Sequence, residues 1–552
     1  MERWALATFV ASLESHLASD HIERASRQKE RGFGALLVSG LTLFAVAVDG
    51  YHPYAEDGGL YMAGVKRLLD PALYSHGTAF VLEPMRLSMF APTVAGLVRM
   101  SHLGLPMVLL LLHLASVWAT LFAAWMLAVR CWTSRTTRAG AVALLACWLA
   151  LPVAGTALFL MDPYLTARSF STPCMVLALV GSLDMTEWNG DAKATMRQRG
   201  FLLWVGSLVV AAAMHPLMAA YALGATMMLV CVRSSRRGVP VWGTAAFAAT
   251  ALAMASWLQE IAKPESANYI RVAMTRRYWF PAEWRWFEWV GLAAPLVILA
   301  MQAWPTVALA RIAKASCVTP GLVVFVEAQR ALARMAIAVG ATAGIAAMLL
   351  ARAGAPTHLV ARMQPLRAFQ IVYLVMVLAL GAKMGERVLR RSAWRWGFAM
   401  VLLGGVMFGA ERTVFPDSDH VELPWIGSRN AWVQAFVWIR EHTPKDAVFA
   451  LDADYINARG EDAQCFRAIA ERSALPDYSK DGGEASIAPE LTEAWKIGQA
   501  AQYGLSGPAM TDTGRLAALS PLGVSWVVLE SGAATNFDCP YANAAAKVCR
   551  LR

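Results

Sequence analysis

The apolar residues of this chain gather in blocks that are about as long as a membrane is thick. The first block, Phe33–Val48, follows a polar, amphipathic segment at residues 1–32. A helix of about 20 apolar residues crosses a bilayer, so we interpret this block as a retained span with a cytoplasmic N-terminus. Further candidate spans lie at about 103–129, 139–160, 173–184, 200–214, 217–232, 240–262, 287–309, 331–350, 367–382 and 396–410. The pattern predicts a mainly α, polytopic membrane protein with about 11 transmembrane helices within residues 33–411.

The charges between these blocks predict the orientation of the chain. With a cytoplasmic N-terminus, every short inner loop is basic, as expected from the excess of Lys and Arg on the cytoplasmic side of membranes. The basic groups are Arg130/Arg135/Arg138, Lys193/Arg197/Arg199, Arg233/Arg236/Arg237, Arg311/Lys314 and Lys383/Arg387/Arg390/Arg391/Arg395. The outer loops are then 50–102, 161–172, 263–286 and 351–366, and the C-terminus also lies outside.

Hydropathy drops after about residue 411, and residues 412–552 are typical of a soluble α/β domain. We expect Trp432–His442 to form an amphipathic helix that stops at Thr443-Pro444. Val448–Leu451 and Val524–Leu529 are expected to form short buried strands. The orientation places this small domain on the outer side of the membrane.

Composition agrees with a membrane protein. Hydrophobic residues make up 57% of the chain and charged residues 16%, with a mean hydropathy of +0.44. Soluble domains are about 45–50% apolar and about 25% charged. This balance excludes an ordinary cytosolic enzyme and a disordered chain. The net charge of +10 is explained by basic cytoplasmic loops, so it does not call for a nucleic-acid partner.

The eight cysteines show no CxxC spacing, which argues against a zinc or redox site. In an oxidising outer compartment, Cys539 and Cys549 are spaced so that a disulfide could close a hairpin-like loop. The sequence leaves the disulfide and the free thiols equally open. Cys465 would be left over.

The segment after the first span carries the clearest candidate chemistry. Glu56 and Asp57 are adjacent, and Gly58 and Gly59 follow, where a tight turn or the close approach of a ligand is allowed. Leu60–Leu69 is then expected to form a short amphipathic helix. One carboxylate of the pair is a candidate general base for an acceptor hydroxyl. On spacing alone, it is more common for two such carboxylates simply to cap the helix that follows.

An acidic pair directly after the first span, followed by a Tyr-containing helix, resembles the GT-C superfamily of integral-membrane glycosyltransferases. The segment His52-Pro53-Tyr54-Ala55-Glu56-Asp57 is similar to their acidic signature, which commonly reads Asp-Glu. The stretch from Trp438 to Phe449 also looks like the C-terminal part of uncharacterised bacterial membrane proteins of this type. The resemblance places the chain in the bacterial inner membrane, with a periplasmic C-terminal domain.

The resemblance also implies a reaction. The donor would be a sugar on a polyprenyl phosphate or diphosphate, transferred with inversion to a glycan, lipid or protein acceptor. Asp57 would be the base, assisted by Glu56, and the lipid phosphate would leave. Cations must then stabilise the developing negative charge, and Arg binds phosphate bidentately.

Three outer arginines are candidates for this cation, and each has an alternative. Arg362 and Arg367 lie around the Pro365 break and are expected to face one cavity, but contact with lipid headgroups explains them as well. Arg168 follows Asp162, a second carboxylate that would hold acceptor or metal. The same segment is also compatible with a capped helix start at Pro173.

Tyr61, His52 and His215 complete the set of candidate binding residues. His215-Pro216 separates two apolar runs, where polar residues often line a cavity, although a buried, hydrogen-bonded histidine is more common. No spacing supports a metal site, and a divalent metal at Glu56, Asp57 and Asp162 stays open. No cofactor is assigned.

A second hypothesis is a non-catalytic membrane transporter, or a scaffold for the assembly of envelope polysaccharide. A transporter is expected to carry polar residues at mid-membrane on several spans. Here the polar residues crowd the outer edge, which favours chemistry at one surface.

Overall fold

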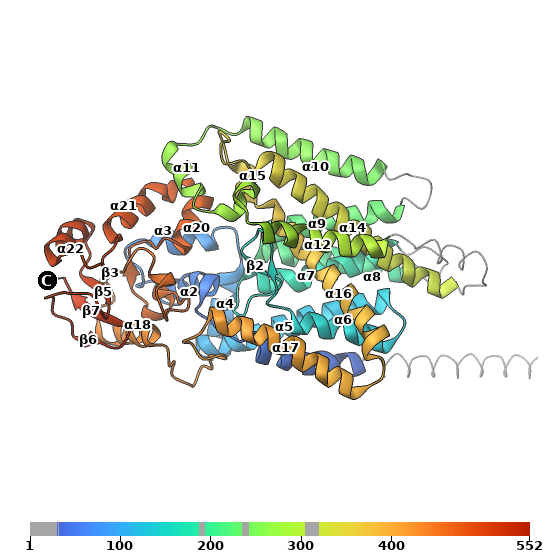
Figure 1. Cartoon of the computed structure of the whole chain (residues 1–552), viewed down its shortest axis with the longest axis horizontal. Helices are drawn as coiled ribbons and strands as arrows, with labels where there is room; N and C mark the ends of the chain where they lie inside the picture. Colours follow the sequence, from blue (N-terminus) through green and yellow to red (C-terminus); the bar gives the residue numbers. More distant parts are fainter. Residues whose placement is uncertain (1–29, 31, 187–193, 235–241, 304–319, 552) are drawn as a thin grey trace, which may run out of the picture.

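The computed structural model describes residues 30, 32–186, 194–234, 242–303 and 320–551, which are mainly helical (Figure 1). Most of the predicted cytoplasmic segment 1–32 lies outside the described residues. The same holds for part of the predicted inner loops, including Lys193, Arg236, Arg237, Arg311 and Lys314, and for residues 304–309 of one expected span.

Within the described residues, seven helical segments are long and apolar enough to cross a membrane. They are Gly32–Asp49, α5 (Leu105–Cys131), α9 (Pro216–Ser234), α12 (Trp286–Ala303), α14 (Pro320–Leu350), Leu359–Leu389, which contains α15 (Leu359–Met363) and α16 (Phe369–Met384), and α17 (Ala393–Val414). The other expected spans correspond to α6 (Arg135–Cys147), α7 (Ala167–Thr186), α8 (Ala194–Met214) and α10 (Trp242–Ile261). The number of about 11 spans therefore stays a prediction.

The expected span at 139–160 is wrong in its second half. Helix α6 ends at Cys147, and β1 (Pro152–Val153) pairs antiparallel with β2 (Leu158–Phe159). Proline removes a helical donor and favours an extended chain. The Thr156 hydroxyl donates to the Val153 carbonyl (2.7 Å) and accepts from the Leu158 N–H (3.2 Å), which satisfies the backbone of a buried turn.

The predicted first outer loop consists of short helices near the N-terminal end of α5. They are α2 (Glu56–Leu69), α3 (Thr78–Leu82), η1 (Glu83–Met85) and α4 (Phe90–Ser101). Helix α2 begins four residues before the predicted start, so Glu56 and Asp57 lie in its first turn. Acidic side chains are favourable there because the N-terminal end of a helix is electropositive.

Residues after α17 form a small domain around one five-stranded sheet, at the end of the bundle where α2 and α3 lie (Figure 1). Its strands are β3 (Val448–Ala450), β4 (Ser473–Ala474), β5 (Trp526–Glu530), β6 (Tyr541–Ala542) and β7 (Ala546–Arg550). The order is β4-β3-β5-β7-β6, parallel across β4, β3 and β5 and antiparallel beyond. Its helices are α18 (Ala431–His442), α19 (Phe466–Ala470), α20 (Lys480–Ile487), α21 (Thr492–Gln502) and α22 (Asp512–Leu519). The C-terminal domain therefore combines helices with a small sheet, as predicted, although α17 extends to Val414, past the predicted start at residue 412.

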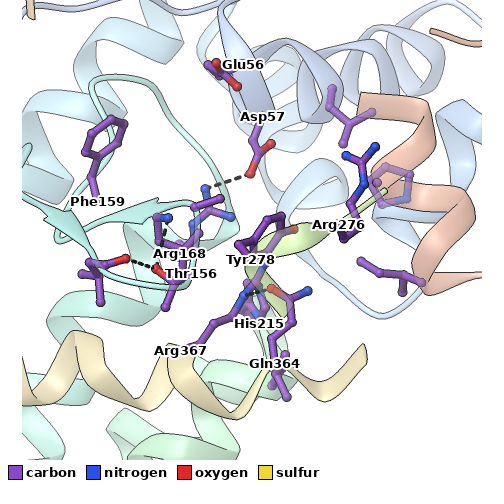
Figure 2. A pocket seen from close by; sticks show the side chains of 18 of the residues that line it. Glu56, Asp57, Thr156, Phe159, Arg168, His215, Arg276, Tyr278, Gln364 and Arg367 are labelled. Carbon is purple, nitrogen blue, oxygen red and sulfur yellow. Dashed lines mark hydrogen bonds and ion pairs between the residues drawn. The ribbon is translucent and has the colours of Figure 1, made fainter. Parts of the chain in front are cut away.

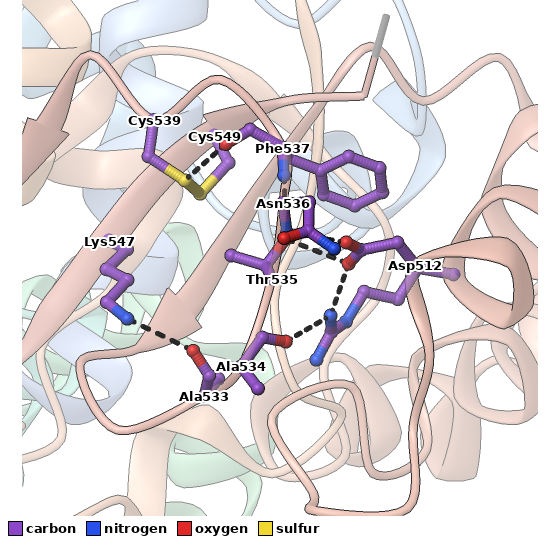
Figure 3. Close-up of a disulfide and its surroundings, with 10 residues drawn as sticks. Asp512, Ala533, Ala534, Thr535, Asn536, Phe537, Cys539, Lys547 and Cys549 are labelled. Atoms are coloured by element: carbon purple, nitrogen blue, oxygen red, sulfur yellow. Dashed lines mark hydrogen bonds and ion pairs between the residues drawn. A yellow bond between two sulfur atoms is a disulfide. The ribbon is translucent and has the colours of Figure 1, made fainter.

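Cys539 and Cys549 form a disulfide, which decides between the two open alternatives (Figure 3). It joins the segment before β6 to β7. Asp512 of α22 ties the same segment down, because its carboxylate accepts from the Thr535 hydroxyl (2.8 Å) and the Asn536 N–H (2.6 Å). Cys465 is a free, buried cysteine.

Helix α2 packs closely against the segment before α7 and against the C-terminal domain. A Cβ on Gly58 would lie 2.8 Å from the Tyr164 Cβ, and one on Gly59 would lie 2.1 Å from the Cys465 Cβ. Neither glycine has a positive φ. The sequence interpretation of a tight turn that admits a ligand is therefore wrong at these two positions, because protein side chains occupy the space.

We expect Gly59→Ala to weaken this docking. The added methyl group would overlap Cys465 and the Tyr54 carbonyl oxygen, and overpacking of this kind costs about 1–3 kcal/mol. Thermal unfolding of the purified protein in detergent should show a lower melting temperature. Gly96→Ala in α4 is the control, because a Cβ there meets nothing within 4 Å. Equal melting temperatures for the two variants would contradict the docking.

Candidate functional site

A cavity of about 1080 Å³ lies where the helical bundle meets the C-terminal domain. Helix α2, the β1–β2 hairpin, the start of α7, the α8–α9 junction, the segment 359–367 and α20 all contribute to its walls. Its lining combines arginines and carboxylates with apolar side chains such as Phe159, Leu217 and Phe287. Figure 2 shows this mixed lining from close by. The volume is in the range of small-molecule binding sites.

The predicted acidic pair opens onto this cavity. Glu56 and Asp57 both line it, and their side chains are 33% and 29% exposed. Glu56 has a φ of +51°, which is unusual for a residue with a side chain. Its N–H donates to the Ala463 carbonyl of the C-terminal domain (2.8 Å). A strained backbone held by a neighbouring domain is a common feature of functional sites.

Arg168 connects the acidic pair to Asp162. Its Nη2 lies 3.0 Å from Asp57 Oδ2 (Figure 2). The same nitrogen lies 2.8 Å from Asp162 Oδ2. Asp162 is buried, and its Oδ1 has no hydrogen-bond partner among the described residues. Helix α7 begins at Ala167, so Pro173 lies inside it. The expected helix start at Pro173 is therefore wrong, and Arg168 lies at the cavity in the first turn of α7.

Lys480 of the C-terminal domain reaches the same pair from the other side. Its Nζ contacts Glu56 Oε2 and lies 3.2 Å from Asp57 Oδ1. Burial alone would raise the pKa of Asp57, but Lys480 and Arg168 hold it well below its usual range. Burial alone would lower the pKa of Lys480, but Glu56 and Asp57 raise it. Asp57 is therefore ionised at any physiological pH.

The arginines of the late segment differ in their surroundings. Arg367 lines the cavity, and its one side-chain hydrogen bond to the described residues runs from Nε to Gln364 Oε1 (2.7 Å; Figure 2). Arg362 also lines the cavity, but its Nη2 pairs with Glu265 Oε1 (3.2 Å) and its guanidinium lies over the Tyr269 ring. Arg367 is therefore the more available cation.

Of the remaining predicted residues, Tyr61 and His215 line the cavity and His52 does not. Burial, with Arg367 and Arg168 nearby, lowers the pKa of His215 to about 3, so its ring is neutral. His52 is buried beside Glu411 and Glu422, at 2.8 and 2.9 Å. Burial alone would lower the pKa of His52, but these hydrogen bonds raise it. Its position joins α17 to the first outer loop, away from the cavity.

Several cavity residues escaped the sequence analysis. Lys480 and Glu484 come from α20, more than 400 positions from Glu56, and the β1–β2 hairpin was hidden in an apolar block. Arg276 lies in the predicted outer loop 263–286, but it was not among the candidate site residues. It donates to the Ser479 carbonyl (2.9 Å) and the Tyr478 carbonyl (3.0 Å). No local motif marks these positions.

The donor set at the acidic pair does not suit a metal. Within the part of the chain that the structure describes, no group of three or more His, Cys, Asp or Glu side chains is arranged to hold one. Glu56, Asp57 and Asp162 are separated by the cations of Lys480 and Arg168. Hard divalent ions need about six oxygen ligands.

No protein-family model and no curated protein matches the chain. Among solved structures, the Archaeoglobus fulgidus oligosaccharyltransferase in complex with Zn and sulfate is similar over 90% of this chain and 68% of its own, with 12% identity and a TM-score of 0.43. Oligosaccharyltransferase AglB from the same organism, in complex with an inhibitory peptide and a dolichol-phosphate, is similar over 91% of this chain and 70% of its own, with 14% identity and a TM-score of 0.37. The arabinofuranosyltransferase AftD from Mycobacteria is similar over 94% of this chain and 41% of its own, with 13% identity and a TM-score of 0.46. Likeness this distant assigns no activity to this chain.

Glu484 gives the site a pH-dependent stability. Burial, with Asp57 and Asp481 nearby, raises the pKa of Glu484 to about 8. An unfolded glutamate has a pKa of about 4.3. A carboxyl whose pKa is raised on folding destabilises the fold progressively as the pH rises from the unfolded to the folded value.

We therefore expect Glu484→Gln to stabilise the protein more at about pH 8 than at about pH 5. The measurement is the difference in melting temperature between variant and wild type at each pH. Glu530→Gln on β5 is the control, because that residue is exposed and does not line the cavity. A difference that does not change with pH for Glu484→Gln would rule out the raised pKa.

Proposed function

We propose that this chain is an integral-membrane glycosyltransferase that moves a sugar from a polyprenyl-phosphate or polyprenyl-diphosphate donor to an acceptor at the outer face of the membrane. One observation carries the proposal. A single cavity beside apolar helices holds an ionised carboxylate, Asp57, and a guanidinium, Arg367, whose terminal nitrogens make no hydrogen bond to the described residues. A transferase that uses a charged lipid donor needs both groups at one site.

The reaction follows from this pairing. The acceptor hydroxyl oxygen attacks the anomeric carbon, the bond from that carbon to the phosphate oxygen breaks, and the electron pair leaves with the phosphate. The acceptor proton goes to the Asp57 carboxylate. A single displacement inverts the anomeric configuration. Arg367 faces the charge that develops on the leaving phosphate, which is where a fixed cation lowers the barrier most.

Asp57 is a weak base because Lys480 and Arg168 lower its pKa. A weak base is adequate when the acceptor oxygen is already bonding to the anomeric carbon, because the hydroxyl proton is then acidic. Glu484 lines the same cavity but has a pKa near 8, so it is mostly protonated at neutral pH. It is suited to donating a hydrogen bond to a sugar hydroxyl.

The cavity walls agree with a lipid-linked sugar. The carboxylates of Glu56, Asp57 and Glu484 lie on α2 and α20. The apolar side chains of Leu217, Phe287 and Met363 come from helices that are long enough to cross a membrane or are part of such a segment. A polyprenyl chain would follow these side chains and present its phosphate to Arg367. Tyr61 would contact the sugar or acceptor. The outer orientation of the site rests on the basic inner loops predicted from the sequence. The bacterial inner-membrane location rests on the family resemblance.

We expect Asp57→Asn to abolish most transfer without unfolding the protein. The amide keeps the shape of the side chain but cannot take a proton, and loss of a general base costs about 10²–10⁴-fold in rate. Release of label from radiolabelled polyprenyl-phosphate sugars by membranes at matched expression measures this. Asp70→Asn is the control, because Asp70 ends the same helix and pairs with Lys445 on the surface.

A wild-type rate in Asp57→Asn would refute the assignment of the base. Release at background level from both proteins, with several sugars and native acceptors, would favour the transporter or scaffold instead. A scaffold would tolerate neutral substitution of Glu56 and Asp57.

Arg367→Ala should lower kcat/KM for the donor by about 10²-fold or more, because one donor facing a developing anion is worth this much. Arg367→Lys should recover part of the loss, since an ammonium keeps the charge but not the bidentate geometry. Steady-state kinetics with varied donor concentration measures kcat/KM for the wild type and for both variants. Arg271→Ala on α11 (Ala267–Ala273) is the control, because Arg271 is exposed and does not line the cavity. Equal loss in Arg271→Ala would point to general destabilisation.

A further inference from the structure

The contact of Lys480 with the acidic pair is unusual for a lysine of a peripheral domain. Its side chain is only 16% exposed, and Nζ contacts one oxygen of Glu56 and one oxygen of Asp57. Arg168 takes the second oxygen of Asp57 (3.0 Å). The two carboxylates are therefore enclosed by a cation from each domain.

The backbone that carries Lys480 is held on the side of the C-terminal domain. The Lys480 N–H donates to Asp477 Oδ1 (2.6 Å), and the Asp477 N–H donates to Asp481 Oδ2 (2.8 Å). Asp481 is fully buried and pairs with Arg467 at 2.7 and 2.8 Å. A buried arginine–carboxylate pair with this geometry fixes the turn before α20.

The same turn is also held from the membrane side. Arg276, in the segment after α11, donates to the carbonyls of Ser479 and Tyr478. The Lys480 ammonium thus has a defined position at the cavity edge, and it does not sample the surface as an exposed lysine does.

Lys480 takes the position from which a divalent ion would have to bind both carboxylates of the pair. One oxygen of each carboxylate, Glu56 Oε2 and Asp57 Oδ1, contacts the Lys480 ammonium. A dication at that point would meet a fixed positive charge at contact distance. Asp162, the third carboxylate considered for a metal, is already paired with Arg168.

We propose that Lys480 is a built-in cation that positions the acidic pair in place of a divalent metal, so that this chain transfers its sugar without one. The proposal concerns a positioning residue and, for its activity measurements, rests on the proposed function. Lys480 holds Glu56 and Asp57 in register and balances their charge. The C-terminal domain thereby completes the site that the first outer loop begins.

The first measurement is Mn²⁺ binding to the purified full-length protein, followed by electron paramagnetic resonance. We expect no Mn²⁺ bound at the acidic pair, so the wild type and Asp57→Asn should give the same Mn²⁺ signal. Mn²⁺ bound to the wild type and lost in Asp57→Asn would overturn the proposal. Mn²⁺ binding needs no sugar donor and no turnover, so its result is independent of the glycosyltransferase assignment. That assignment is refuted only by the absence of sugar transfer.

The second measurement is sugar transfer by the wild type, Lys480→Met and Lys480→Arg after treatment with EDTA. We expect wild-type transfer to be unchanged by EDTA, Lys480→Met to lose roughly tenfold or more, and Lys480→Arg to keep a larger share because it retains the charge. The acid limb of the kcat/KM profile should also move to higher pH in Lys480→Met, since Asp57 then keeps only Arg168. A purely structural role would not move this limb.

The matched control is Lys445→Met. Lys445 also belongs to the C-terminal domain and also pairs with a carboxylate of α2, Asp70, at 2.9 Å, but on the surface. Loss of wild-type transfer on EDTA treatment, restored by Mn²⁺, would overturn the proposal. So would a Lys480→Met protein that transfers at the wild-type rate with an unshifted acid limb.

Discussion

The alternating charges from Asp162 through Arg168 and Asp57 to Lys480 are the interaction on which the rest of the site depends. Its members come from three parts of the chain, namely the segment at the start of α7, helix α2 and helix α20. Removing one leaves a buried or half-buried charge without its partner. Such losses are costly because the remaining ion is already separated from water. The same contacts join the membrane region to the C-terminal domain, so the site and the domain arrangement are one structural problem.

This coupling explains why α2 is packed so closely. Gly58 and Gly59 bring its first turn against Tyr164 and Cys465, and the Glu56 backbone adopts a left-handed conformation to meet the C-terminal domain. Both features cost conformational freedom. They hold the acidic pair at the cavity edge, where a small displacement would separate it from Lys480 and Arg168.

The cavity itself divides into two regions of different character. Asp57, Glu484 and Lys480 lie towards the C-terminal domain, while Arg367 and the apolar side chains come from the membrane region. A ligand with a polar head, a phosphate and an apolar tail would satisfy both regions at once. The neutral ring of His215 and the protonated Glu484 add hydrogen-bonding groups without adding charge, which keeps the electrostatic contrast between carboxylate and guanidinium.

The sequence by itself determined the apolar blocks, the presence of a C-terminal domain and the helix at Trp432–His442, and it singled out Asp57, Arg168 and Arg367 as candidate site residues. These features follow from local periodicity and residue chemistry, which do not depend on distant neighbours. Only the tertiary structure decided that α6 gives way to a hairpin, that His52 faces away from the cavity, and that Lys480 reaches Glu56. Contacts between residues more than 400 positions apart leave no periodic signal, because they are set by how two domains dock and not by either segment alone.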